Sequence, residues 1–172
     1  MTALVLLAAA AMSPTPGLKV QGTKLLTPEG APIHLRGFNA MWWVAPSHDH
    51  ARLMKSMGAN CARYMFGRST PERPVSRTQE VVEHVKRLTD AGLWVIPTVH
   101  DFGTKGKAPY DDPEVQKEFL AMWKDIILQL RDSPLIAAWE PMNEPHDATP
   151  ERVRAWYAEV IKFFRTLDPH RP

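Results

Sequence analysis

The chain has 172 residues, of which 44% are hydrophobic and 23% are charged, the composition of one soluble globular domain with a sizeable core. Its net charge of +2 is small and its basic residues are scattered among acidic ones, which excludes a nucleic-acid-binding face and an anionic membrane as partners. The single cysteine, Cys61, permits no disulfide within the chain and lies in an apolar run, so we expect it to be buried rather than reactive.

The first 17 residues are expected to precede the folded domain. Residues 1–12 form an apolar run about as long as the hydrophobic part of a secretory signal peptide and too short to span a bilayer. Small residues at 9–11 are typical of a cleavage site, although no Lys or Arg precedes the run. We therefore expect a secreted protein, with a signal peptide and spacer over residues 1–17 and the folded domain over residues 18–172.

The folded part is predicted to begin with a hairpin and then to alternate strands with helices. Residues 18–22 and 24–27 form two short strands, and a turn leads to the first core strand at 33–38. The later strands are predicted at 60–66, 93–99 and 135–140, and the helices at 76–91, 112–132 and 149–167.

Apolar stripes and capping residues support the predicted helices. Ser76 begins a capping box, while Asp112 and Thr149 each stand before a proline in the first helical turn. Apolar residues recur at intervals of three and four in the last two helices, a pattern typical of packing against a sheet. Trp123 and Trp156 belong to these stripes, so we expect them in the core and assign them no functional role.

Alternating strands and helices at about thirty-odd residues per unit predict a parallel sheet, either an open doubly wound sheet or part of an eightfold barrel. The loops after the strands, at 67–75 and 101–111, are long and rich in Gly, Pro and charge, whereas the loops after the helices are short. Ligands are therefore expected at the carboxyl ends of the strands. The segment 36–43 is bulky and aromatic rather than glycine-rich, which counts against a nucleotide-binding fold.

The strongest functional signal lies at residues 136–145, where an apolar strand leads to Glu144, flanked by Asn143 and bounded by prolines. At the mouth of a closed sheet a carboxyl is partly desolvated and is able to donate and take back protons near neutral pH. An ordinary turn before the next helix is the alternative. The position directly after a strand favours an active-site carboxyl.

Polar groups also stand at the ends of the other predicted strands. Asn39 follows the first strand, Arg63 lies in the second, and His100 with Asp101 follows the third. Because parallel strands end at one rim, we expect these groups to converge. A cation inside an apolar strand must find an anion, so the alternative role of Arg63 is a structural salt bridge, for instance to Glu140. The alternative for His100 is a core histidine with satisfied hydrogen bonds.

Two aromatic residues and a histidine-rich triplet follow the first core strand. Trp42 and Trp43 present faces suited to stacking on a sugar ring, with ordinary packing as the alternative. The triplet His48-Asp49-His50 contains metal-ligand types, but it lacks further partners and lies where a helix should begin. We therefore expect no metal and no cofactor.

Several blocks in order resemble the cellulase family, glycoside hydrolase family five; they are residues 24–39, 57–63, 91–101 and 139–145. The resemblance implies an eight-stranded (β/α) barrel that hydrolyses β-linked glucan or mannan with retention at the anomeric carbon. It makes Glu144 the general acid and base, beside Asn143, which contacts the sugar 2-hydroxyl and the nucleophile. It makes Arg63 the group that holds the nucleophile ionised and His100 a contact in the cleavage subsite. Further substrate contacts are expected from Asn39, Trp42, Trp43 and Asp101.

The likeness covers the N-terminal half of such a barrel, about four strand-and-helix units. A retaining glycosidase needs two carboxylates about 5 to 5.5 Å apart, and the family's nucleophile, a glutamate of the seventh strand, has no counterpart in this sequence. We therefore expect little or no activity from this chain alone, and self-association through its open sheet edges. A non-catalytic carbohydrate-binding or scaffold protein is the alternative from another class.

Overall fold

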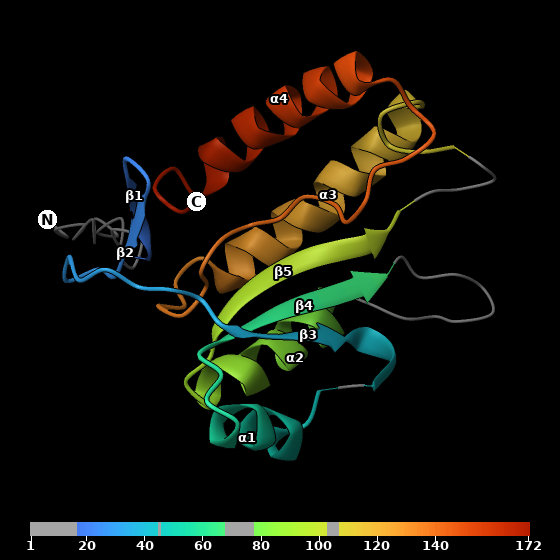
Figure 1. Cartoon of the computed structure of the whole chain (residues 1–172). Coiled ribbons are helices and arrows are strands. Elements are labelled where there is room, and N and C mark those ends of the chain that lie inside the picture. The colour runs from blue at the N-terminus through green and yellow to red at the C-terminus, as the bar shows by residue number, and fades with distance from the viewer. Residues whose placement is uncertain (1–16, 45, 68–77, 103–106) are drawn as a thin grey trace, which may run out of the picture.

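The computed structural model describes residues 17–44, 46–67, 78–102 and 107–172 (Figure 1). The predicted signal peptide and spacer lie outside the described residues except for Gly17, and so does the predicted cap Ser76. Within the described part, no helix has the length and apolar character needed to cross a membrane.

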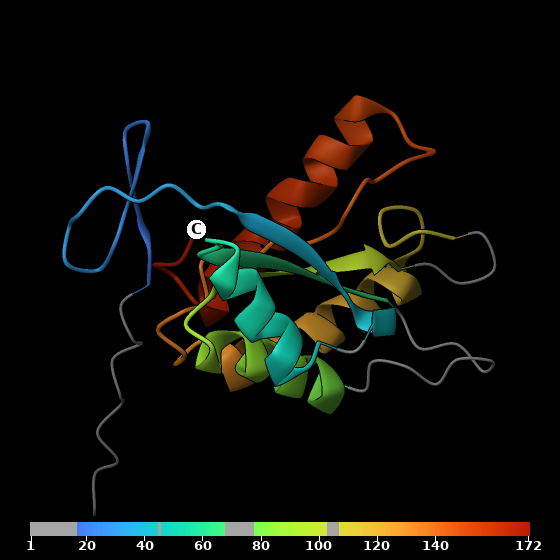
Figure 2. The same ribbon diagram turned by 60° about the horizontal axis from the view of Figure 1, so that its bottom comes forward.

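The described chain opens with the predicted hairpin. Strands β1 (Lys19–Gln21) and β2 (Lys24–Leu26) pair antiparallel, with Val20 opposite Leu25. Gly22 has φ of +59° in the tight turn between them, a conformation that glycine adopts without strain. The hairpin stands apart from the main sheet (Figure 2).

The first core strand begins later than the predicted 33–38. Strand β3 spans Gly37–Met41, because the backbone before it is used by the hairpin: the Ile33 amide donates to the carbonyl oxygen of Leu25 at 2.9 Å. Gly37 begins the strand where the neighbouring backbone comes very close. A Cβ atom at that position would lie 1.6 Å from the carbonyl oxygen of Cys61, so no side chain fits there.

The main sheet is parallel and has the order β3-β4-β5. Strands β4 (Cys61–Gly67) and β5 (Trp94–Asp101) agree with the predicted strands at 60–66 and 93–99. Asn39 stands opposite Arg63 in the β3–β4 register, so both lie at one level of the sheet.

The predicted fourth strand, 135–140, is not a continuous strand. It meets β5 through two isolated parallel bridges, Val95 to Ile136 and Thr98 to Glu140, and between them it advances one residue further than β5 does. Pro97 of β5 lies in this interval and has no N–H to donate to the ladder. The missing donor and the extra residue break the regular pairing, although the segment still lies beside β5.

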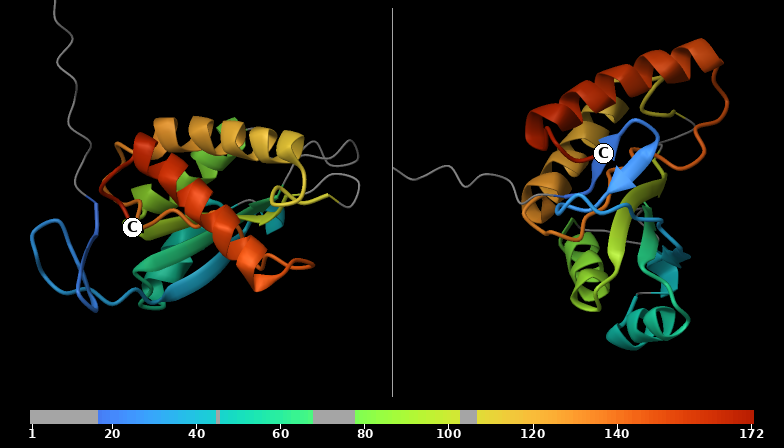
Figure 3. Two further views of the ribbon diagram at one scale, coloured as in Figure 1. Left: turned by 90° about the horizontal axis from the view of Figure 1, so that it is seen from above. Right: turned by 60° about the vertical axis from the view of Figure 1, so that its left-hand side comes forward.

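Three α-helices of the described residues agree with predicted ones: α2 (Thr78–Asp90), α3 (Pro113–Leu130) and α4 (Pro150–Leu167). A further helix, α1 (His48–Ser56), begins where the triplet at 48–50 indicated a helix start. The Asp112 side chain accepts hydrogen bonds from the first backbone amides of α3, and that of Thr149 accepts from the Arg152 amide in α4, so both predicted caps are confirmed. Helices α2 and α3 cover one face of the sheet, and α4 packs beside α3 (Figures 1 and 3).

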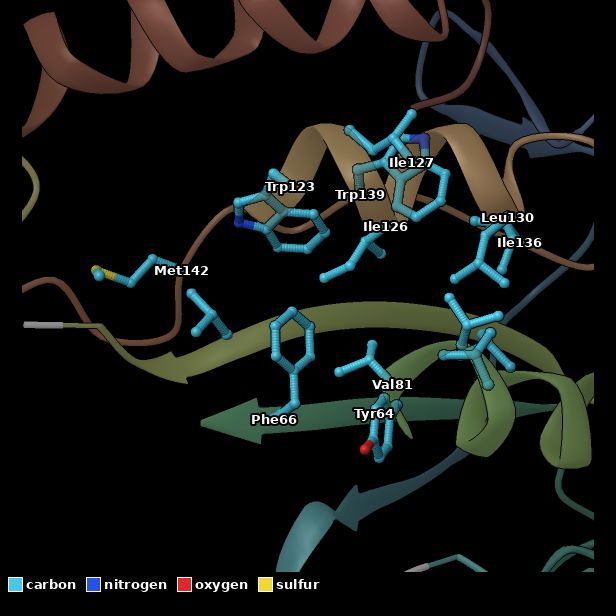
Figure 4. Close-up of a cluster of buried hydrophobic side chains, with 14 of the residues drawn as sticks. Tyr64, Phe66, Val81, Trp123, Ile126, Ile127, Leu130, Ile136, Trp139 and Met142 are labelled. Carbon is cyan, nitrogen blue, oxygen red and sulfur yellow. The ribbon is translucent and has the colours of Figure 1, made fainter. Parts of the chain in front are cut away.

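The core lies between the sheet and this helical layer. Figure 4 shows Phe66 of β4 directed toward α3, where its ring centroid lies 5.4 Å from that of Trp123. Trp123 and Trp156 are buried, as predicted. Cys61 is also buried, as predicted, and burial raises the pKa of its thiol to about 11.

Candidate active site

The geometry of the site begins at Arg63, whose side chain projects from β4 on the face away from the helices. Its Nε donates to Glu140 Oε2 at 2.6 Å, its Nη2 donates to Glu140 Oε1, and Nη2 also donates to Asn143 Oδ1 at 2.9 Å. The hydrogen bonds that Arg63 donates to Glu140 raise the pKa of Arg63, partial burial opposes this rise, and the negative charges of Glu140 and Glu144 add to it. The salt bridge to Glu140, the alternative that the sequence left open, is confirmed.

Asn143 is held on both its backbone and its side chain. Its backbone amide donates to the carbonyl oxygen of Val99 at 2.8 Å, and the residue is 9% exposed. Arg63 carries only donors, so the Oδ1 atom of Asn143 must face it and the Nδ2 group must point the other way. The amide is therefore fixed in one orientation at the end of β5.

Glu144 lies at the rim of a cavity of about 400 Å³, together with His100 and Asn143. Glu144 is exposed, so the partial burial expected from its position after a strand is wrong. Glu144 is exposed because, among the described residues, the sheet ends at the segment 135–140, which pairs with β5 only through two isolated bridges. The carboxyl therefore lies at an open sheet edge and is not surrounded by a closed sheet. Its φ of +43° places the residue in the left-handed region.

Side chains of the helical layer hold the loop around Glu144, and no local sequence signal revealed them. The indole N–H of Trp123 donates to the carbonyl oxygen of Pro141 at 3.1 Å, and the Tyr157 hydroxyl donates to that of Met142 at 3.0 Å. The Tyr110 hydroxyl donates to the carbonyl oxygen of His146 and accepts from its amide at 3.2 Å. Trp123 thus combines its predicted core position with a contact to the site loop.

The two tryptophans after β3 differ in their surroundings. Trp43 is 52% exposed, and its ring centroid lies 5.9 Å from that of His100, edge to face. Trp42 is partly buried against the core, with its ring close to the backbone of Gly67. Packing therefore accounts for Trp42, whereas about half of Trp43 stays exposed next to His100, which lines the cavity.

Two predicted substrate contacts do not join this group. Asn39 is exposed and lines a separate groove of about 270 Å³ between β3 and α1. Asp101 is the last residue of β5, and its side chain lies outside what the structure describes. The structure therefore brings together Arg63, His100 and Asn143 with Glu144.

The triplet at 48–50 forms the first turn of α1. Ser47 and His50 make a capping box, in which the Ser47 hydroxyl accepts from the His50 amide and His50 Nδ1 accepts from the Ser47 amide. Asp49 pairs with Arg52 in the same helix. Capping accounts for His50 and an ion pair within the helix accounts for Asp49. The described residues contain no group of three acidic, His or Cys side chains able to hold a metal ion.

The arrangement provides the exposed carboxyl of Glu144 at a strand end and the fixed amide of Asn143 beside it. The guanidinium of Arg63 binds this amide, and the imidazole of His100 lines the same cavity. This is the class of site found at the carboxyl ends of the strands in (β/α) barrel enzymes. The cellulase family, glycosyl hydrolase family 5, matches residues 26–172, so the chain belongs to this family.

Relatives by sequence are glycosidases. The chain is 28% identical to a β-xylosidase of Phanerodontia chrysosporium over 139 residues, which cover 70% of this chain and 29% of the relative. It is 32% identical to a probable mannan endo-1,4-beta-mannosidase C of Aspergillus terreus over 104 residues, 52% of this chain and 26% of the relative. The chain thus spans between about a quarter and a third of the length of these two relatives.

Solved structures show the same fold. The catalytic domain of a mannanase from Streptomyces sp. SirexAA-E superposes with a TM-score of 0.71 at 18% identity, covering 97% of this chain and 52% of the mannanase. A β-mannanase from Thermomonospora fusca superposes with a TM-score of 0.70 at 18% identity, covering 89% of this chain and 51% of that protein. The predicted (β/α)8 barrel architecture is confirmed for the part that this chain covers, about half a barrel.

Proposed function

We propose that this chain supplies the acid/base half of a retaining glycoside hydrolase that cleaves β-1,4-linked mannan, with Glu144 as general acid and base. The observation that carries the proposal is the convergence of Glu144, Asn143 and His100 on one cavity, with Asn143 tied to Arg63. Family membership supports hydrolysis of a β-linked polysaccharide. Mannan is preferred over glucan because relatives in both sequence and structure are named mannanases.

The proposed chemistry follows from the side chains. Departure of a sugar leaving group needs a proton on the glycosidic oxygen, which the Glu144 carboxyl donates and later recovers from water. Asn143 directs its Nδ2 group away from Arg63, so it is oriented to donate to a sugar hydroxyl. The exposed ring of Trp43, next to His100, offers a face for the apolar side of a sugar ring.

A second carboxylate on the opposite side of the sugar is required for retention. Glu140 does not offer one, because it lies in the same strand segment that leads to Glu144 and is paired with Arg63. We propose that the nucleophile is not among the described residues and that the 172-residue chain by itself binds oligosaccharide with little or no turnover. The role of Arg63 toward that nucleophile stays a prediction.

The proposal is tested by titrating the isotope-labelled chain with mannohexaose, cellohexaose and xylohexaose and following the NMR signals of His100, Asn143 and Glu144. Mannohexaose is expected to shift these signals more than the other two sugars do. Equal or absent shifts for all three sugars would contradict the proposed substrate. Trp43→Ala is expected to weaken binding, whereas Trp94→Ala, at the far end of β5, serves as the matched aromatic control.

Hydrolysis of mannan by the purified chain is the second measurement. We expect no turnover or a trace. Turnover that disappears in Glu144→Gln and persists in the control Glu151→Gln, an exposed glutamate of α4, would establish the acid/base role and show that the proposed inactivity is wrong. Turnover that persists in Glu144→Gln would overturn the role of Glu144.

We also propose export and self-association. The apolar run at residues 1–12 supports export, because it has the length of the hydrophobic part of a signal peptide. The proposed substrate also supports export, because a polysaccharide is met outside the cell. Phe38, Val44, Leu53 and Met57 are large apolar residues between 41% and 63% exposed around the groove at the β3 edge, which supports association. Secretion from an expressing host tests the first proposal. Sedimentation of a stable monomer would contradict the second.

A further inference from the structure

We infer that the hydroxyls of Tyr110 and Tyr157 position Glu144 by clamping the loop that carries it from both sides. Tyr157, on α4, donates to the carbonyl oxygen of Met142, before Glu144 in the chain, at 3.0 Å. Tyr110, in the segment before α3, donates to the carbonyl oxygen of His146, after Glu144. The inference rests on the proposed acid/base function and concerns how its carboxyl is placed.

The loop requires such support because its own backbone preferences oppose its shape. Glu144 has φ of +43° and Asp147 has φ of +58°, a region that is costly for residues other than glycine and persists only where the surroundings hold it. Residues 141–149 belong to no helix or strand, so their polar backbone groups depend on partners from other elements. The two hydroxyls supply partners on either side of the strained Glu144.

Tyr110 is itself held firmly enough to act as a support. It is 9% exposed, and its ring packs against Trp156 with the centroids 5.6 Å apart. Its carbonyl oxygen accepts from Arg152 Nε at 2.8 Å, and Arg152 Nη2 lies 3.1 Å from Asp111 Oδ1. Burial raises the pKa of the Tyr110 hydroxyl, which keeps it protonated and able to donate.

Tyr157 is fixed by the helix that carries it. Its ring meets that of Trp156 with the centroids 4.9 Å apart, and Trp156 is buried in the core. Burial also raises the pKa of the Tyr157 hydroxyl. Both hydroxyls therefore connect the site loop to one rigid aromatic anchor, Trp156.

The clamp acts at the wall of the candidate active site. Tyr110, Met142 and His146 line the same cavity as Glu144. Asn143 is held separately, by Val99 and Arg63, so loosening the clamp changes the place of Glu144 relative to a partner that stays fixed. This makes the two tyrosines positioning residues rather than groups that touch the reacting atoms.

The test compares Tyr110→Phe and Tyr157→Phe with a matched control, Tyr64→Phe. Each substitution removes one hydroxyl, and the Tyr64 hydroxyl also makes a hydrogen bond, to His84 Nδ1 at 2.8 Å, between β4 and α2. The isotope-labelled 172-residue chain is used. The first readout is the three-bond coupling between the amide and α protons of Glu144, which reports φ, and the second is the exchange rate of the His146 amide.

In Tyr110→Phe we expect the His146 amide to exchange about fivefold faster, the effect of losing one hydrogen bond. Both clamp variants are expected to change the Glu144 coupling, and Tyr64→Phe is expected to leave both readouts unchanged. Thermal unfolding midpoints are measured to check that all three variants fold. An unchanged Glu144 coupling in both clamp variants, or an equal change in Tyr64→Phe, overturns the inference.

A mannohexaose titration separates this inference from the proposed function. Absence of any mannohexaose-induced shift in the unsubstituted chain counts against the proposed function, while the coupling and exchange rates still decide whether the clamp sets the conformation of Glu144. Where mannohexaose does shift the Glu144 amide, the shift is expected to shrink in the clamp variants and to persist in Tyr64→Phe. An identical shift in all variants overturns the positioning role.

Discussion

On the face of the parallel sheet that meets α2 and α3, Tyr64, Phe66 and Val99 are completely or almost completely buried, and apolar contacts surround them. Arg63, the residue directly before Tyr64 in β4, lies on the other face. It keeps 27% of its side-chain area exposed and donates hydrogen bonds to carboxylate and amide oxygens. Side chains alternate between the faces, so one strand serves both surroundings. The comparison indicates that the face against the helices stabilises the fold through apolar burial, whereas the face with Arg63 presents polar groups that are available for chemistry.

The largest expected effect is on the buried face. Trp123→Ala is expected to lower the free energy of unfolding by about 3 to 5 kcal/mol, because it removes a fully buried ring and leaves a cavity. Urea denaturation measures the change. The matched control is Trp43→Ala, at an exposed ring, for which about 0.5 kcal/mol or less is expected. Similar losses for both variants would break the distinction between the faces.

Glu140→Gln tests the most strongly bonded pair of the polar face. We expect a loss of about 1.5 to 3 kcal/mol, because the partly buried guanidinium loses the negative charge of its partner and one of its two hydrogen bonds to residue 140. The control Asp49→Asn removes an exposed ion pair with Arg52 and should cost about 0.5 kcal/mol or less. Equal values for the two variants would show that the Arg63 pair behaves as a surface salt bridge.

Cys61 gives a pH-dependent probe of the sheet. Burial raises the pKa of its thiol from 9.0 to about 11, so its contribution to stability is complete below pH 9 and is lost as the pH rises toward 11. The stability difference between the unsubstituted chain and Cys61→Ala is expected to shrink by about 1 kcal/mol between pH 8 and pH 10. Chemical denaturation at several pH values measures it. A difference that stays constant over this range would contradict the raised pKa.

Glu144→Gln is expected to have the smallest effect on stability, within about 0.5 kcal/mol, because the side chain is exposed. Its proposed acid/base role is nevertheless removed. Calorimetric unfolding of the variant checks the prediction. A clear loss of stability would show that the carboxyl contributes to the fold and would weaken the separation between the two faces.

The sequence predicted the elements whose signals are local. The caps at Asp112 and Thr149 and the apolar stripes of the last two helices depend on neighbouring residues, and the structure confirms them. The predicted start of the first core strand and the predicted continuous strand at 135–140 were wrong, because each depends on where a partner backbone lies. Pro97 has no N–H group, and this interrupts the strand pairing only because the segment 135–140 lies beside β5.

The sequence predicted part of the candidate site, as it predicted part of the fold. Strand-end positions indicated that Arg63, His100 and Asn143 would gather near Glu144, and the structure brings them together. The supporting contacts of Tyr110 and Tyr157 were not predictable. Their partners are carbonyl oxygens, which every residue has, so no pattern of residue types marks them.

The sequence by itself determined that Trp123 and Trp156 face the core, where α3 and α4 begin and which family the chain resembles, because periodicity, caps and ordered motifs are properties of neighbouring residues. Only the tertiary structure decided that Glu140 binds Arg63, that Asn39 lies outside the cavity and that Glu144 is exposed. These features depend on distances between segments far apart in the chain, and such distances are fixed by packing and by backbone hydrogen bonds rather than by local preference.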